Sequence, residues 1–170
     1  MCVQLTKQIK WSLYLLLTSL TTGAYAITTD VEKPVQIEAD QAVFDKSAGT
    51  ATYSGNVIIR QGTLEILATN IQINAPENEI QSIVAKGVPV SLKQQMDNGK
   101  LTHGEATEMQ YFVKDKRLIL NGNAKLTQDK DTFASNHIEY LPDSGQLIAG
   151  TKGKSGRVSA TFYPTNKASE

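Results

Sequence analysis

The residues of this sequence that come nearest to a known chemical motif lie close to its C-terminus. The run Gly150-Thr151-Lys152-Gly153-Lys154-Ser155 resembles a loop that binds the phosphates of a nucleotide. Such a loop requires a further glycine five residues before its Gly-Lys-Ser, and Ile148 occupies that position. No helical pattern follows the run. We therefore interpret it as a solvent-exposed loop of glycine and lysine.

Two histidines are the next candidates, because histidine serves both as a metal ligand and as an acid–base group. His103 and His137 are 34 residues apart, and neither has a second ligand at the spacing of a metal motif. A zinc site needs three or four convergent ligands. We therefore expect no metal site, and we place both histidines on the surface or at strand edges.

Acidic residues could supply a catalytic pair, as they do in glycoside hydrolysis. Asp97 and Asp143 fall in predicted turns, and Glu65 and Glu139 are examples of acids on polar strand faces, where carboxylates are usually solvated. Composition does not exclude a Ser-His-Asp triad, but the Gly-x-Ser-x-Gly motif of many hydrolases is absent. The sequence offers no constellation for catalysis, so we expect a protein that is not an enzyme and uses no cofactor.

The N-terminal 26 residues have the pattern of a secretory signal peptide. Lys7 and Lys10 precede a short apolar run, and Ala24-Tyr25-Ala26 supplies small residues at a cleavage site. The run is shorter than the roughly 18 residues of a membrane span. We expect cleavage after Ala26, one domain over residues 27–163 and a disordered polar tail over residues 164–170.

The mature chain would be nearly neutral and free of cysteine. Removal of the signal peptide takes away Cys2, the single cysteine, together with two lysines, so the formal net charge at pH 7 changes from 0 to −2. Without disulfides, an exported protein depends on core packing for its stability. A chain with so little net charge lacks the basic face that binds phosphates, so we expect no nucleic-acid partner.

Apolar and polar residues alternate with a period of two in the mature chain, which predicts antiparallel strands with one apolar face. Val57 and Ile59 are one example of the pattern, and Leu118 and Leu120 are another. Turn signals separate the runs, because glycine and asparagine tolerate the positive φ of tight connections. These signals include Ala48-Gly49, Ser54-Gly55-Asn56, Gln61-Gly62, Asn121-Gly122-Asn123 and Asp143-Ser144-Gly145.

The two halves of the chain repeat each other. A shift of 67 positions lays residues 37–73 on residues 104–140 without a gap, so that Gly55-Asn56 falls on Gly122-Asn123. A weaker copy begins 29 residues later within each half, around Ala68 and around Ser135. We expect about four units of two strands joined by a turn, and units this small bury their apolar faces only by stacking.

The apolar strand faces allow two interpretations. They form the filled core of a β-sandwich, or two sheets stand slightly apart and hold an apolar ligand between them. In the second case, burial of an acyl chain would supply roughly 0.8 kcal/mol per CH₂ group. Periodicity alone does not distinguish the two.

An ordered set of motifs resembles the OstA-like family of envelope proteins. The resemblance covers nearly the whole mature chain and extends to the signal peptide and the overall length. The chain is most similar to the soluble periplasmic member, which transports lipopolysaccharide, because neither a transmembrane helix nor a barrel is predicted. The matching residues are Val35–Asp40, Tyr53–Gly62, Met96–Lys100 and Leu120–Ala124.

The resemblance implies an all-β fold, an antiparallel β-jelly roll that is open at both ends and built from duplicated hairpins. It also implies an apolar groove for the acyl chains of lipid A, with Val35 and Ile37 on the first strand near the entrance. Tyr111 matches a family tyrosine with Val113 as its apolar neighbour, and Leu92 stands where the family carries an aromatic residue. The predicted groove residues are Val35, Ile37, Phe44, Val57, Ile59, Ile66, Ile73, Leu92, Met109, Tyr111, Val113, Leu120 and Phe133.

The resemblance further implies the partners of a periplasmic bridge. These are lipopolysaccharide, further copies of the chain stacked head to tail, an inner-membrane anchored OstA-like component at the N-terminal edge, and the periplasmic domain of the outer-membrane lipopolysaccharide assembly barrel at the C-terminal edge. Two other functions remain open from the sequence. One is a monomeric periplasmic carrier of lipids or lipoproteins, and the other is a jelly-roll enzyme that acts on envelope glycans.

Overall fold

The computed structural model describes residues 30, 33–96, 98–151 and 156–164. The predicted signal peptide and residues 165–170 of the predicted tail lie outside the described residues. Within the described residues, the chain forms strands joined by turns and one short 3-10 turn, Pro76–Asn78. The strands are β1 (Gln36–Glu38), β2 (Gln41–Asp45), β3 (Thr50–Gln61), β4 (Leu64–Asn74), β5 (Ser82–Gln95), β6 (Leu101–Phe112), β7 (Arg117–Gln128), β8 (Asp131–Leu141), β9 (Gln146–Ala149) and β10 (Ser159–Thr161).

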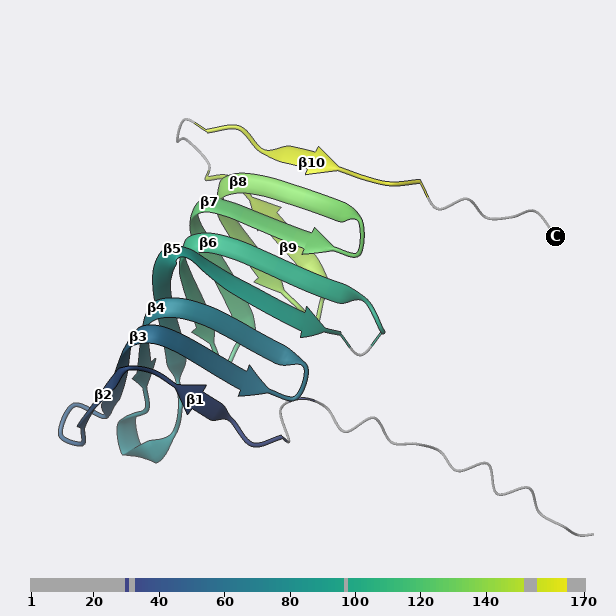
Figure 1. The fold of residues 1–170 in the computed structure, drawn as a ribbon. Coiled ribbons are helices and arrows are strands. Elements are labelled where there is room, and N and C mark those ends of the chain that lie inside the picture. Colours follow the sequence, from purple (N-terminus) through teal and green to yellow (C-terminus); the bar gives the residue numbers. More distant parts are fainter. Residues whose placement is uncertain (1–29, 31–32, 97, 152–155, 165–170) are drawn as a thin grey trace, which may run out of the picture.

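All ten strands belong to one antiparallel sheet. Its order is β1-β3-β4-β5-β6-β7-β8-β10, while β2 pairs with β3 and β9 pairs with β8. The all-β antiparallel prediction is therefore confirmed, and the sheet is open, because its first and last strands do not pair with each other. The two facing layers belong to this one sheet and are not separate sheets. A single sheet folds over on itself, and Figure 1 shows the long strands bending at the left of the view and continuing behind.

A shift in register marks the bend in each of the long strand pairs. The shift lies between Ser54 and Val57 in β3, and its counterpart in β7 lies between Asn121 and Ala124. The strand halves on either side of the bend form two layers. Layer A comprises β2, β9 and one half of each long strand. In β3 this half is residues 50–54, which pair with β2, and in β8 it is residues 138–141, which pair with β9. Layer B comprises β1, β10 and the other halves, including 57–61 of β3.

The Gly-Asn pairs lie at this bend and not in hairpin turns. Gly55 and Asn56 have φ values of 77° and 43°, and Gly122 and Asn123 have 75° and 49°. The predicted positive φ is confirmed, but the predicted turn between two strands is wrong, because both pairs lie inside the continuous strands β3 and β7. At each bend two residues have no cross-strand register partner and form a bulge, and bulges bend a strand and increase its twist.

The 67-residue repeat is confirmed by the strand register. Ile37 lies opposite Ile59, and at the shifted positions Gly104 lies opposite Leu126. The short strands β1 and β2 together correspond to β6, because residues 36–45 shifted by 67 positions fall on residues 103–112. The pair β1 and β2 is therefore one bent strand that is interrupted at its bend, as β9 and β10 are at the other edge.

The core lies between the two layers. Side chains alternate across each strand, so every second residue points inward and meets the inward side chains of the opposite layer. The largest fully buried side chains come from both layers, and complete burial of such a side chain contributes about 1.5–3 kcal/mol. They are Ile71, Leu120 and Ile138 of layer A and Val57 and Val90 of layer B.

Candidate functional site

Two inward-facing rows of side chains cross the whole sheet. The strand register defines each row, because each residue lies directly opposite the next. The row in layer B, which we call the B row, consists of Ile37, Ile59, Ile66, Leu92, Gly104, Leu126, Phe133 and Ala160. The row in layer A, the A row, consists of Phe44, Ala51, Ile73, Ile83, Tyr111, Leu118, Tyr140 and Leu147.

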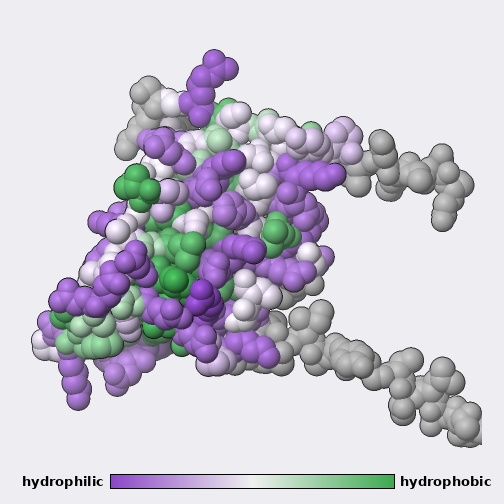
Figure 2. Space-filling view, viewed as in Figure 1, coloured by the Kyte–Doolittle hydropathy of each residue, from purple (hydrophilic) through white to green (hydrophobic). Residues whose placement is uncertain are grey.

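The residues at the ends of both rows are more exposed than the buried residues within them. Leu92 and Leu126 in the middle of the B row are buried, whereas Ile37 and Phe133 are only partly buried. In the A row, Phe44 at the β2 edge is 69% exposed. Figure 2 shows hydrophobic surface toward the lower left of the molecule, where β1 and β2 end the sheet in Figure 1. Both ends of the apolar interior therefore reach solvent.

The middle of the interior is filled by the protein's own side chains. Ile71, Leu120 and Ile138 are completely buried between the layers. The filled-core interpretation therefore describes the centre of the molecule. One row further from the bend, Ile66, Ile83 and Tyr111 are only partly buried, so part of their surface is open to solvent. A ligand would find apolar surface in these outer rows.

Comparison with known proteins assigns the fold to a family. The family model described as "LptA/(LptD N-terminal domain) LPS transport protein" matches residues 36–146, which run from β1 to the start of β9. The chain belongs to this family. Lipopolysaccharide export system protein LptA of Escherichia coli strain K12 is 34% identical over 145 residues, which cover 84% of this chain and 77% of that protein.

Two comparisons involve Pseudomonas aeruginosa. Its lipopolysaccharide export system protein LptH is 30% identical over 155 residues, which cover 85% of this chain and 87% of that protein. A crystal structure of LptH, described as the LptA-homologous periplasmic component of the lipopolysaccharide transport device, superposes with a TM-score of 0.72 at 25% identity. The superposition covers 81% of this chain and all of LptH. The predicted resemblance to OstA-like proteins is thus confirmed.

Ten of the thirteen predicted groove residues lie in the apolar interior of this LptA/LptD family member. Two positions differ from the expectation that they line it. Val35 precedes β1 and is half exposed, and Val113 follows β6 in a turn and lies outside the hydrophobic cluster. Phe44, the third residue outside that cluster, stacks edge to face on Tyr53 with ring centroids 5.8 Å apart. The ten interior residues are Ile37, Val57, Ile59, Ile66, Ile73, Leu92, Met109, Tyr111, Leu120 and Phe133.

Several interior residues were missed by the sequence prediction. Leu126 occupies the middle of the B row, and Tyr140 and Ile83 belong to the A row. The repeat carries the signal that would have found Leu126, because a shift of 67 positions places the predicted Ile59 on it. Ile83 lies in β5, which the repeat does not cover, so no such signal exists for it.

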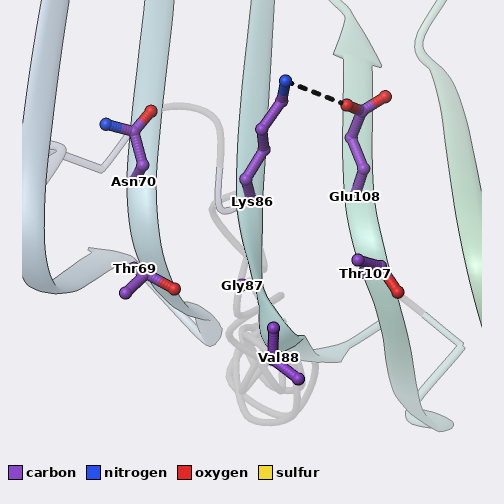
Figure 3. Close-up of a pocket in the computed structure, with 7 residues that line it drawn as sticks. All are labelled: Thr69, Asn70, Lys86, Gly87, Val88, Thr107 and Glu108. Atoms are coloured by element: carbon purple, nitrogen blue, oxygen red, sulfur yellow. Dashed lines mark ion pairs between the residues drawn. The ribbon is translucent and has the colours of Figure 1, made fainter.

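A shallow pocket of about 310 Å³ lies at the bend, away from the predicted groove residues. It is formed by neighbouring bends of β4, β5 and β6, and Lys86 Nζ pairs with Glu108 Oε2 across it at 3.4 Å (Figure 3). None of its lining residues belongs to the hydrophobic cluster. We assign no ligand to it. The lining residues are Thr69, Asn70, Lys86, Gly87, Val88, Thr107 and Glu108.

Several charged groups of the described residues form ion pairs outside the apolar interior. On the outer face of layer B, Arg60 bridges Glu38 of β1 and Glu65 of β4 with N–O distances of 3.0 and 3.1 Å. His103 contacts Glu105, and His137 Nδ1 lies 2.7 Å from the Oδ1 of Asn121. No group of three potential metal ligands occurs among the residues that the structure describes.

Tyr111 brings a titratable group into the A row. Burial raises the pKa of its hydroxyl, while the nearby Lys116 lowers this pKa and Asp143 raises it. The net pKa is higher than usual, so the phenol stays neutral at physiological pH. The inward surface therefore remains free of charge at Tyr111.

Among the described residues, the structure contains no helix with the length and hydrophobicity required to cross a membrane.

Proposed function

We propose that this protein binds lipopolysaccharide between its two layers and passes it across the periplasm as one unit of a bridge. One observation carries the proposal. A member of the LptA/LptD family has two apolar rows that cross the whole sheet and remain accessible at both edges. The relatives are named as lipopolysaccharide export proteins, which supports the same ligand for this chain.

Acyl chains would contact the side chains of the outer inward rows. Ile66 and Phe133 of layer B and Ile83 and Tyr111 of layer A are partly buried, so the layers need to separate only there. Burial of each CH₂ group contributes roughly 0.8 kcal/mol without any directed polar contact. The thirteen predicted groove residues remain our proposed contacts, with those of the B and A rows as the principal ones. The role is binding and transfer without a catalysed reaction.

The edges of the sheet support assembly from head to tail. Neighbouring strands alternate in direction along the order β1 to β10, so β1 and β10 run in opposite directions. The β1 edge of a second copy would therefore continue the antiparallel pattern beside β10. Exposed strand edges readily add a further strand. A contact between two different edges repeats without closing and produces a filament.

The same assembly would extend the apolar rows from one copy to the next. Ala160 ends the B row and Ile37 begins it, and Leu147 and Phe44 have these positions in the A row. Stacked copies would thus form one continuous apolar path. At the two ends of the path, we propose an inner-membrane anchored family member beside β1 and the periplasmic domain of the outer-membrane assembly barrel beside β10.

This function requires export of the chain. We propose that residues 1–26 form a cleaved signal peptide, that residues 27–163 form the domain, and that residues 164–170 form a tail.

The proposed function can be tested at Ile37. Replacement of Ile37 by aspartate places a charge in the B row beside Ile59, and an unpaired charge against acyl chains costs at least a few kcal/mol. We expect the amount of lipopolysaccharide that co-purifies with the protein to fall by about tenfold or more. Gln36→Asp is the matched control, because Gln36 is its exposed neighbour on the opposite face. If the same amount of lipopolysaccharide co-purified with the wild type, with Ile37→Asp and with Gln36→Asp, a groove at the B row would be refuted.

A further inference from the structure

The last inward-facing row of layer B is polar. It follows the B row toward the hairpin turns that join β3 to β4, β5 to β6 and β7 to β8. The register places Gln61 opposite Leu64, and it places Gln94, Thr102, Gln128 and Asp131 each opposite the next. Three glutamines and a threonine occupy inward positions where the alternation would place apolar residues. The row, which we call the polar lip, consists of Gln61, Leu64, Gln94, Thr102, Gln128 and Asp131.

The polar lip is inside the molecule and not on its outer surface. Thr102 is only 3% exposed and is the one buried polar residue among the described residues. Gln94 and Gln128 flank it on the neighbouring strands and are half buried. The outward-facing neighbour Gln95 is exposed. The amides of the lip therefore face the same space as the apolar side chains of the B row.

Two glutamines of the polar lip, Gln94 and Gln128, make long hydrogen bonds, whereas Gln61 Nε2 donates to the Lys33 carbonyl oxygen at 3.0 Å. Gln128 Nε2 donates to Thr102 Oγ1 at 3.4 Å, and Gln94 Nε2 donates to Asp30 Oδ2 at 3.3 Å. These distances exceed the usual 2.7–3.2 Å range for an N–H···O bond. Among the described residues, neither Gln94 Oε1 nor Gln128 Oε1 accepts a hydrogen bond. Half-buried amides with this unused capacity favour a polar ligand.

Layer A has a different last row. Its last inward-facing row within the strands is the A row, and the hydroxyls of Tyr111 and Tyr140 are the only polar side-chain groups in it. The two layers therefore present unlike surfaces to a ligand that enters between them. Layer A is aliphatic and aromatic up to the ends of its strands, whereas layer B changes from the apolar B row to the polar lip.

We propose that the polar lip binds the neutral polar backbone of the lipid, its amide, ester and hydroxyl groups, and thereby fixes the orientation of the lipid between the layers. This inference rests on the proposed function. The acyl chains lie against the A and B rows, and the groups that join them to the sugar lie against Gln94, Thr102 and Gln128. A carboxamide both donates and accepts hydrogen bonds, as do the amides and hydroxyls of such a backbone.

The chemistry of the lip selects neutral groups over phosphates. Phosphate recognition uses arginine and lysine, because charge-assisted hydrogen bonds are the strong ones. The polar lip contains neither residue, and its one charged residue, Asp131, would repel an anion. Phosphates of the same lipid would therefore lie beyond the lip, in solvent. The lip thus discriminates between lipids with an amide-rich backbone and simple fatty acids.

The test compares two ligands and three variants of the full chain. Gln94→Leu and Gln128→Leu each remove an amide from the lip while retaining its volume, and Gln95→Leu is the matched control on the outer face of β5. The ligands are lipopolysaccharide and a fluorescent long-chain fatty acid. Because a hydrogen bond contributes about 0.5–1.5 kcal/mol, each lip variant should lower the affinity for lipopolysaccharide by about 3- to 10-fold.

The fatty acid shows whether the loss is specific to the lip. We expect both lip variants to bind it as tightly as the wild type or more tightly, and we expect Gln95→Leu to bind both ligands normally. Unchanged lipopolysaccharide affinity in both lip variants would overturn the lip assignment and leave the proposed function intact. An equal loss of both ligands would also overturn it, since the groove itself would then be damaged. A wild-type protein that binds no lipopolysaccharide would refute the proposed function together with the lip.

Discussion

Gly122 lies so close to Thr107 of the neighbouring strand that the two residues fix the bend of the sheet. Thr107 Oγ1 donates a hydrogen bond to the carbonyl oxygen of Gly122 at 3.2 Å, and a Cβ atom on Gly122 would lie 2.7 Å from this hydroxyl. The first half of the chain repeats the arrangement 67 positions earlier, where a Cβ on Gly55 would lie within 3 Å of the Asp40 side chain. Both bends therefore require glycine for two reasons, a positive φ and a close neighbour.

Replacement of Gly122 by alanine should destabilise the fold. The φ of 75° alone costs an L-residue roughly 1–2 kcal/mol, and displacement of Thr107 adds to this cost. We expect Gly122→Ala to lower the free energy of unfolding by about 2–4 kcal/mol in urea denaturation. Gly99→Ala is the control, because Gly99 has a φ of 80° but no atom within 4 Å of the added Cβ. Equal losses in the two variants would show that the close contact contributes nothing.

The same bends show where sequence reasoning succeeds and where it fails. Alternation and the 67-residue repeat predicted the strands and their equivalence, because both depend on side chains that alternate regularly. The bend was misassigned, because Gly-Asn with positive φ is also the signal for a two-residue hairpin. Only pairing distinguishes the two, since β3 continues along β4 beyond Asn56. The turns 113–116 and 129–130 were missed because they contain no glycine.

The stability of the N-terminal segment should depend on pH through Asp30. Burial raises the pKa of this carboxyl, but hydrogen bonds from Thr63, Gln94 and the Leu64 backbone lower it, and the net pKa is below the ordinary 3.8. A lowered pKa means that the stabilisation is present above pH 3.8 and is lost as the pH falls through the folded-state pKa. Asp30→Asn should lower the melting temperature at pH 7 and have less effect near the folded-state pKa.

This prediction is checked by thermal melts of both proteins from pH 7 downward. The backbone N–H of Thr63 donates to Asp30 Oδ1 at 2.9 Å, and an asparagine oxygen can still accept this bond. The variant removes the charge together with the bonds that Asp30 Oδ2 accepts from Thr63 Oγ1 and Gln94 Nε2, so the change of the difference in melting temperature with pH reports the charge. A difference in melting temperature that is the same at all pH values would contradict it.

The candidate site was predicted in part, and the limit is physical. Alternation identifies which side chains point inward, so ten of the thirteen proposed residues lie in the interior. It does not identify depth, because depth depends on how far a residue lies from the bend, and the bend was misassigned. Leu120 and Tyr111 both alternate correctly, yet Leu120 is fully buried at the core and Tyr111 lies in the outer row. The polar lip was not predicted, because Gln61 was interpreted as part of a turn signal and polar residues were not considered as part of the inward face.

Self-association should depend on Phe44. Its ring is 69% exposed at the β2 edge, where a second copy would place Leu147 of β9 next to it in the A row. Phe44→Asp should reduce the growth of particle size with concentration in sedimentation velocity experiments, because an unpaired charge would be buried in the contact. Val88→Asp is the control, since Val88 is 94% exposed at the bend, far from either edge in the strand order. An effect of equal size in both variants would indicate general electrostatic repulsion and contradict edge-to-edge stacking.

The fully buried centre should set the stability of the domain, and Leu120 tests this directly. Leu120 is completely buried in layer A between Met109 of β6 and Ile138 of β8. Truncation to alanine loses the transfer free energy of the removed carbons and leaves a cavity, which together cost about 2–5 kcal/mol. Val88→Ala removes two methyl groups from a residue in solvent and should change the free energy of unfolding by less than about 0.5 kcal/mol.

The interior has two roles, stability and ligand binding, and a measurement of lipopolysaccharide affinity in the Leu120→Ala variant separates them. Leu120 is one of the thirteen proposed contacts but lies outside the A and B rows, which supply the principal ones. Folded Leu120→Ala protein should therefore lose little affinity for lipopolysaccharide, and a large loss would show that acyl chains also reach the centre.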